Sequence, residues 1–152
     1  MLNTLILLIM LSQPYPNSCY LTHYEESVKV IKQHEGFRSC EYVIEGVRTI
    51  GYGHTIKKGE VFKCLTEEQA DSLLRADFNS ALKRVDTHIG VKGSRKIALG
   101  HFIYCKGIGT FLKSELYNKI KSGIELVEAD FTKYRFRKSR LFEWELWKLN
   151  CN

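Results

Sequence analysis

A glutamate, a threonine and several glycines lie close together in the sequence between residues 34 and 55. Glu35 follows a helix with apolar periodicity and Gly36 comes next, so we expect the carboxyl group at a helix end. Residues 42–50 have the β-branched, glycine-interrupted composition of a short hairpin. Thr49 lies 14 residues after Glu35, so a returning strand can place its hydroxyl group against the acid. A carboxyl group and a water-positioning hydroxyl across a cleft would suit general acid catalysis.

The environment of the acid matters for this chemistry. Phe37 and Tyr42 are neighbours of Glu35 in the sequence, and we expect their rings to desolvate its carboxyl group in part, as a general acid requires. A glutamate and a threonine at this spacing are common in ordinary turns. The run Thr-Ile-Gly-Tyr-Gly-His-Thr at 49–55 is far more specific and favours a functional site.

Residues 34–55 resemble the active-site signature of the phage-type lysozymes, glycoside hydrolase family 24. The likeness lies in Glu-Gly-Phe-Arg at 35–38, a tyrosine seven residues after the glutamate, and Gly-Val-Arg-Thr-Ile-Gly-Tyr-Gly-His-Thr at 46–55. It implies a muramidase in which Glu35 is the general acid and Thr49 helps to hold the attacking water. The family also has an aspartate in the intervening loop, which is one residue shorter here and has none. Glu45 is the nearest substitute and the candidate base.

The resemblance extends along the chain from about residue 28 to 147. Residues 66–77 match the pattern Thr-x-x-Gln-Ala-Asp-x-Leu-Leu-x-x-Asp, and residues 98–102 match Ala-Leu-x-x-Phe. It implies that Tyr104 and Ser114 line the sugar cleft from the far lobe. The implied fold class is α+β and mostly α: a lysozyme-like fold in which a small N-terminal β-hairpin lobe is joined by a long helix to a C-terminal helical lobe.

The elements that position these residues are predicted from apolar periodicity and capping residues. Capping boxes begin the first helix at Thr22 and the long amphipathic helix at Thr66, which runs over 66–87. Ser94 is the expected N-cap of an apolar helix over 94–106. The remaining predicted helices cover 114–120, 125–133 and 139–149.

The chain of 152 residues is long enough for one catalytic domain, expected over 22–152. Its net charge of +6 is uneven, because residues 91–152 hold thirteen Lys and Arg against six Asp and Glu. A basic lobe favours polyanions, among them nucleic acid, anionic membranes and the bacterial wall. Nucleic acid is the poorest of these, because the basic residues alternate with Trp and Phe at core spacing and no motif for bases is present.

The N-terminal residues 1–19 resemble an export signal or a lipoprotein leader. Leu2 to Leu11 is almost wholly apolar, but ten residues are too few to span a bilayer as a helix. Asn17-Ser18-Cys19 is a loose match to a lipoprotein cleavage site, so lipid anchoring at Cys19 is one prediction. A buried N-terminal strand or the start of a helix is the alternative.

Five cysteines show no spacing typical of a metal site, so no metal and no cofactor are expected. If Cys19 is removed or acylated, four cysteines remain, an even number that could pair in an oxidising compartment. Their spacing does not indicate the pairs. Cys105 falls in an apolar helix, where a small buried thiol is the expected interpretation.

The leading functional prediction is a monomeric, exported muramidase that hydrolyses the β-1,4 bond between N-acetylmuramic acid and N-acetylglucosamine of peptidoglycan, for cell lysis or wall degradation. A lytic transglycosylase that uses the single acid Glu35 is the enzymatic alternative, because it needs no second carboxylate. A wall-binding protein without activity is the third possibility. Peptidoglycan is the expected partner, and any membrane contact would be made through the leader.

Overall fold

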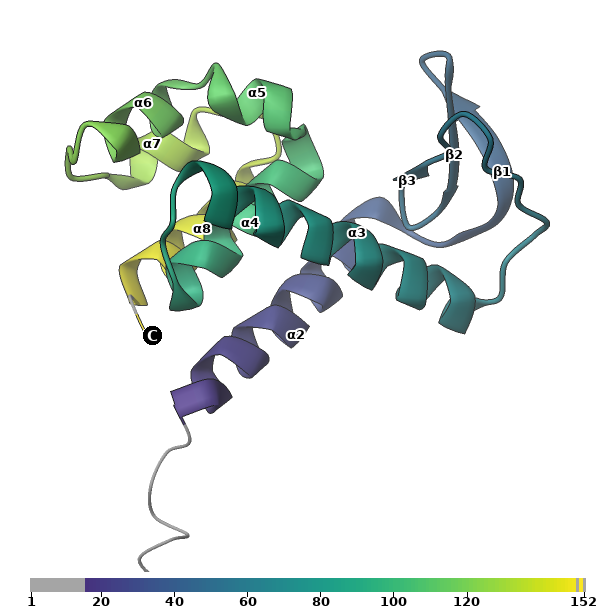
Figure 1. Cartoon of the computed structure of the whole chain (residues 1–152), viewed down its shortest axis with the longest axis horizontal. Helices are drawn as coiled ribbons and strands as arrows, with labels where there is room; N and C mark the ends of the chain where they lie inside the picture. The colour runs from purple at the N-terminus through teal and green to yellow at the C-terminus, as the bar shows by residue number, and fades with distance from the viewer. Residues whose placement is uncertain (1–15, 150, 152) are drawn as a thin grey trace, which may run out of the picture.

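The computed structural model describes residues 16–149 and 151, and the apolar stretch Leu2 to Leu11 lies outside these residues. Three short strands form one end of the molecule and a group of helices forms the other, with one long helix running between them (Figure 1). In chain order the elements are α2 (Pro16–Glu35), β1 (Arg38–Ile44), β2 (Val47–Gly51), β3 (His54–Thr55), α3 (Glu67–His88), α4 (Gly93–Lys106), α5 (Ile108–Leu112), α6 (Glu115–Lys121), α7 (Glu128–Thr132) and α8 (Arg137–Leu149). The predicted fold class is confirmed.

The strands form an antiparallel sheet in the order β1-β2-β3. Ile44 pairs with Val47, so the hairpin turn consists of Glu45 and Gly46 alone. Both turn residues have positive φ angles, 51° and 81°, as the tight two-residue turns that match the twist of a hairpin require. This short connection accounts for the missing residue in the loop.

Helix α3 spans the distance between the two lobes (Figure 1). Its start is fixed by the predicted capping box, in which Thr66 Oγ1 accepts from the N–H of Gln69 and Gln69 Oε1 accepts from the N–H of Thr66. The buried residues of α3 recur every three or four positions and pack into the hydrophobic core. The buried residues of α3 are Ala70, Leu74, Phe78, Ala81, Leu82 and Val85.

Helix α4 is the centre of the helical lobe, packed against α2, α3 and α8. Residues 97–103 are all buried, as the nearly all-round apolar sequence predicts. At Gly100 a Cβ atom would overlap Leu82 Cδ2, so any larger residue would force the Leu82 side chain to shift where α3 and α4 approach closely. This close contact holds α3 against α4 at the centre of the helical lobe.

Predicted helix boundaries were wrong at the starts of α2, α4 and α8 and at both ends of α7. Helix α2 begins at Pro16, six residues before Thr22, and proline suits a first turn because the N–H it lacks has no partner there. Ser94 is not the N-cap of α4, because the helix starts at Gly93 and Ser94 instead exchanges hydrogen bonds with the backbone of Cys151. Helix α7 is shorter than the predicted 125–133.

Two disulfides tie the described chain together, Cys19–Cys151 and Cys40–Cys64. The first joins the first turns of α2 to Cys151, two residues after the end of α8, and the second joins β1 to the loop before α3. Because Cys19 is paired, its sulfur is not free for acylation, so the predicted lipid anchor at Cys19 is incompatible with this structure. Cys19 also lies inside α2. Among the described residues, no helix combines the length and apolar character needed to cross a membrane.

Candidate active site

A polar cleft of about 680 Å³ lies between the sheet and the helical lobe. Its walls come from the end of α2, the β2–β3 turn with β3, the middle of α3 and the end of α4. Glu35 and Tyr104, two of the predicted site residues, line it from opposite lobes. The cleft is therefore built where the long helix α3 brings the two lobes face to face.

Glu35 is the last residue of α2, and the helix ends there because Gly36 takes a φ of 70° and donates its N–H to the Lys32 carbonyl. Glu35 is an exposed residue, and its side chain is 29% exposed. Gly53, with φ 85°, passes so close that a Cβ atom there would lie 3.2 Å from Glu35 Oε2. The glycine of the β2–β3 turn thus leaves room for the acid.

Contacts of His34 and Tyr104 position the residues around Glu35. His34 Nδ1 lies 3.2 Å from Glu35 Oε1, and the His34 ring packs edge-on against Phe136, with ring centroids 4.6 Å apart. From the other side, Tyr104 donates its hydroxyl to the Tyr52 carbonyl at 2.8 Å, which fixes the turn that carries Gly53. Burial first, and then the negative charges of Asp77 and Glu35, raise the pKa of Tyr104. Tyr104 therefore acts as a neutral donor.

Thr49 lies in the middle strand, directly opposite Tyr42 of β1 and Thr55 of β3. Residues paired in this way project from the same face of a sheet, and Thr55 lines the cleft. Thr49 is thus on the cleft-facing side, although it is 7% exposed and is not itself among the lining residues. Its Oγ1 donates to the Val47 carbonyl at 3.2 Å, so a lone pair remains for another donor.

The other two predicted site residues do not line the cleft. Glu45 occupies the exposed hairpin tip and makes no hydrogen bond or ion pair with any described residue. Ser114 is 5% exposed and is the N-cap of α6, where its Oγ accepts from the N–H of Tyr117 and donates to the Phe111 carbonyl. Both hydrogen bonds of Ser114 serve the helix start, as its capping position predicted.

A carboxylate cluster that sequence reasoning did not assign supports the cleft wall. His54 is 4% exposed and contacts Asp77 Oδ2 through Nδ1 at 2.6 Å and Glu60 Oε2 through Nε2 at 3.1 Å. The hydrogen bond from the Lys57 N–H, and to a smaller extent the one from His54, lowers the pKa of the Glu60 carboxyl group. These contacts tie β3 and the loop after it to α3. One feature of the sequence could have indicated this part of the cleft wall, a polar stripe at helical spacing beside the apolar face of α3. Its residues Asp77, Ser80 and Arg84 all line the cleft.

Cys105 lines the cleft and is half-buried, so the prediction of a small buried thiol was wrong. Behind it, fully buried His101 lies with Nδ1 2.7 Å from Glu143 Oε1 and 3.9 Å from Cys105 Sγ. Burial favours neutral His101, but Cys105 and the Glu143 carboxylate outweigh it and raise the pKa of His101 to about 9. Arg140 contacts the same Glu143 oxygen, so this part of the wall rests on a buried ionic cluster.

One group of side chains in the described part of the chain has the proximity of metal ligands. Cys19, His23 and Cys151 offer ligand atoms within 4.8 Å of one another. The two sulfur atoms form a disulfide, and thiolates rather than disulfide sulfurs bind zinc. The cluster therefore belongs to the disulfide.

Comparison with known proteins agrees with this architecture. Residues 32–143 match the family described as Phage lysozyme. The chain is 32% identical over 104 residues to an endolysin of Bacillus phage B103, covering 65% of this chain and 40% of that protein. It is 31% identical over 116 residues to an endolysin of Acyrthosiphon pisum secondary endosymbiont phage 1, covering 72% and 77%. The chain thus spans less than half of the first relative and about three quarters of the second.

A solved structure extends the likeness to three dimensions. The muramidase domain of SpmX from Asticaccaulis excentricus superposes with a TM-score of 0.66 at 25% identity, covering 80% of this chain and 94% of that one. The family match covers more than half of the chain and includes the cleft residues from Glu35 to Ile108. The chain belongs to the phage lysozyme family.

Proposed function

We propose that the protein is a muramidase that hydrolyses the β-1,4 bond between N-acetylmuramic acid and N-acetylglucosamine in bacterial peptidoglycan. The observation that carries this proposal is the position of Glu35, which lines a polar cleft between two lobes while Gly53 leaves space beside its carboxyl group. A glycan strand in this cleft would receive a proton on the leaving oxygen from Glu35. Lys57 and Arg84 line the same cleft and suit the carboxylates of stem peptides.

We assign the water-holding role to Thr49, which shares a sheet face with the cleft-lining Thr55. Inversion requires roughly 6.5–9.5 Å between two carboxyl groups, to leave room for the water. The role of Glu45 as the base was a prediction from sequence position alone, and the structure gives it no support, because the Glu45 side chain does not line the cleft. This observation gives weight to a second candidate, a lytic transglycosylase that depends on Glu35 alone.

Product analysis distinguishes the two reactions. Purified protein is incubated with bacterial walls, and the soluble fragments are examined by mass spectrometry. Hydrolysis adds one water and leaves reducing muramic acid ends, whereas transglycosylation leaves 1,6-anhydro ends. Reducing ends are the expected result. Walls that remain turbid and release no fragments would overturn both enzymatic candidates and leave a wall-binding protein.

Export is the remaining part of the proposal, with the protein acting as a monomer at the cell wall. The disulfides Cys19–Cys151 and Cys40–Cys64 support it, because such bonds persist in oxidising compartments. If a leader is removed, cleavage should fall before Cys19, since that residue is needed for pairing. The intact mass of protein recovered from producing cells measures the start of the chain, and a start after Cys19 would contradict the pairing.

A further inference from the structure

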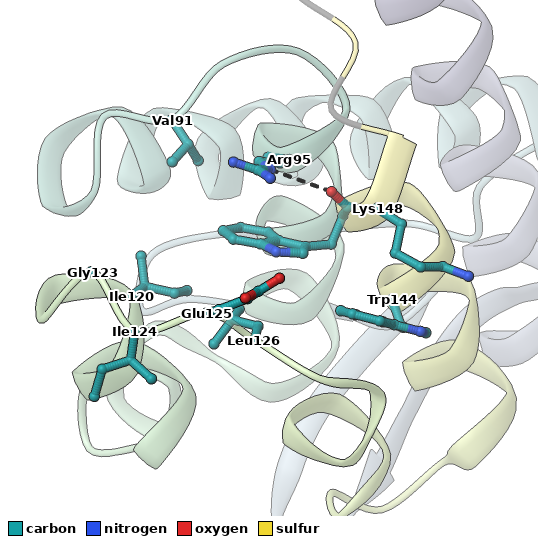
Figure 2. Close-up of a pocket in the computed structure, with 10 residues that line it drawn as sticks. Val91, Arg95, Ile120, Gly123, Ile124, Glu125, Leu126, Trp144 and Lys148 are labelled. Carbon is teal, nitrogen blue, oxygen red and sulfur yellow. Dashed lines mark hydrogen bonds between the residues drawn. The ribbon is translucent and has the colours of Figure 1, made fainter.

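A second hollow, of about 450 Å³, lies on the helical lobe and shares no residue with the cleft (Figure 2). It is bounded by the start of α4, the segment between α6 and α7, and the last turns of α8. We call it the tryptophan hollow, because Trp144 and Trp147, the chain's two tryptophans, both line it. Charged side chains from each of the three segments also line it, namely Arg95, Glu125 and Lys148.

Arg95 and Glu125 both line this hollow without forming an ion pair with each other, whereas Lys148 Nζ pairs with Glu145 Oε1 at 2.8 Å. Arg95 stacks on the Trp147 ring, 4.8 Å from its centroid, and donates Nε to the Trp147 carbonyl at 3.3 Å. Its other guanidinium donors have no partner among the described residues. Glu125 has no hydrogen bond or ion pair there either. In Figure 2, Arg95 lies above Glu125, and the two residues come from different segments. A cation and an anion are thus both available to one ligand.

The rest of the wall is apolar, with Val91, Ile120 and Leu126 beside the two indole rings. A ligand that fits must therefore carry a positive and a negative group joined by an aliphatic stretch. A neutral sugar would leave both charges unpaired, and Arg95 already covers one face of the Trp147 indole. An anionic membrane would be repelled by Glu125 and has no convex apolar surface to meet in a hollow.

We propose that the tryptophan hollow binds the diamino acid of an uncross-linked peptidoglycan stem peptide. The free side-chain amine would pair with Glu125, a peptide carboxylate would pair with Arg95 and Lys148, and the methylene chain would lie against Trp147 and Leu126. The biological meaning of the site rests on the proposed muramidase function, because the stem peptide is part of the same polymer as the glycan. Contact at two places would hold the enzyme on the wall between cuts.

The chain provides its own reporter for this proposal. Since both tryptophans line the hollow and neither lines the cleft, intrinsic tryptophan fluorescence reports on the hollow alone. The probe is the synthetic tetrapeptide L-alanyl-γ-D-glutamyl-meso-diaminopimelyl-D-alanine, titrated into the full chain. A saturable fluorescence change is expected. Chitotetraose and phosphatidylglycerol vesicles are titrated in parallel and are expected to leave the signal unchanged.

Three variants make the test specific. Glu125→Gln and Lys148→Gln should each weaken tetrapeptide binding, by about tenfold for Glu125→Gln, whose charge is otherwise unpaired. Lys83→Gln removes an exposed charge from α3, away from the hollow, and should bind as wild type does. Because neither Glu125 nor Lys148 is buried, both proteins should fold, which thermal unfolding checks.

The outcomes separate this proposal from the proposed function. A tetrapeptide that gives no saturable change, or binding that Glu125→Gln leaves intact, overturns the stem-peptide site. A response to chitotetraose or to vesicles in place of the tetrapeptide overturns it as well. Glu35→Gln should bind the tetrapeptide with wild-type affinity, so loss of wall clearing with binding retained bears only on catalysis.

Discussion

Two carboxyl groups ten residues apart, Glu35 and Glu45, show how differently one residue type can be placed. Each is followed by a glycine with positive φ, 70° at Gly36 and 81° at Gly46. Glu35 ends a packed helix, lines the cleft and lies against Gly53. Glu45 sits at the tip of a two-residue turn without a described partner. A carboxyl group acquires its chemical role from the segment that folds against it. The residues next to it in the sequence do not determine that role.

Replacement of the helix-end acid should have the largest effect. Glu35→Gln keeps the shape of the side chain but removes the proton that the leaving oxygen needs, so wall clearing should fall about 100-fold or more. The measurement is the rate of turbidity loss on bacterial walls, with thermal unfolding as the check on folding. A folded Glu35→Gln protein with near wild-type activity would refute the assignment of the acid.

The next largest effect is expected where the turn leaves space for that acid. Gly53→Ala places a methyl group 3.2 Å from Glu35 Oε2 in a backbone with φ 85°, so the carboxyl group must move by a few tenths of an ångström. Displacement of a catalytic group by up to an ångström can cost between about tenfold and 100-fold in rate. The strained backbone should also lower the free energy of unfolding by about 1–2 kcal/mol.

Gly59→Ala is the matched control for Gly53→Ala. Gly59 has a similar φ of 92°, but a Cβ atom there meets nothing within 4 Å. Its stability should fall by a similar amount while wall clearing is retained. If both alanine variants lose activity equally, the contact of Gly53 with the acid is not what matters.

The contrast between the two glutamates also shows what sequence reasoning can reach. The helix end at Glu35, the capping box at Thr66 and the cap at Ser114 all depend on neighbouring residues, and the structure confirms them. Contacts between distant segments could not be predicted in this way. The disulfide partner of Cys19 lies 132 residues away, and the His54–Asp77 pair depends on how α3 crosses the sheet.

Position in the sequence was equally unable to assign residues to the cleft. Tyr104 lines the cleft, whereas the hydroxyl of Ser114 is committed to capping α6. The tryptophan hollow was not predicted, because Trp144 and Trp147 are at core spacing and only the packing of the segment 120–126 leaves them at a cavity. Such cavities depend on how elements fit together, which single-element periodicity does not contain.

A smaller effect is expected from the strand threonine. Thr49→Ala removes the hydroxyl proposed to hold the water, and loss of one hydrogen bond should cost about threefold to tenfold in rate. Thr49→Ser keeps the hydroxyl and should retain most of the activity, which separates hydrogen bonding from packing at this 7% exposed position. Equal activities for Thr49→Ala and the wild type would remove Thr49 from the mechanism.

The smallest effect is expected at the hairpin tip. Glu45→Gln keeps the two-residue turn and removes a charge that contacts no described residue, so wall clearing should change by less than about twofold. Wall-clearing rates and the end groups of the products are measured side by side for the variant and the wild type. A loss of tenfold or more with correct folding would show that the hairpin brings Glu45 to the glycan as the base. A silent variant that still yields reducing ends would mean that Glu35 and a water held by Thr49 suffice for hydrolysis, whereas anhydro ends from both proteins would identify single-acid transglycosylation.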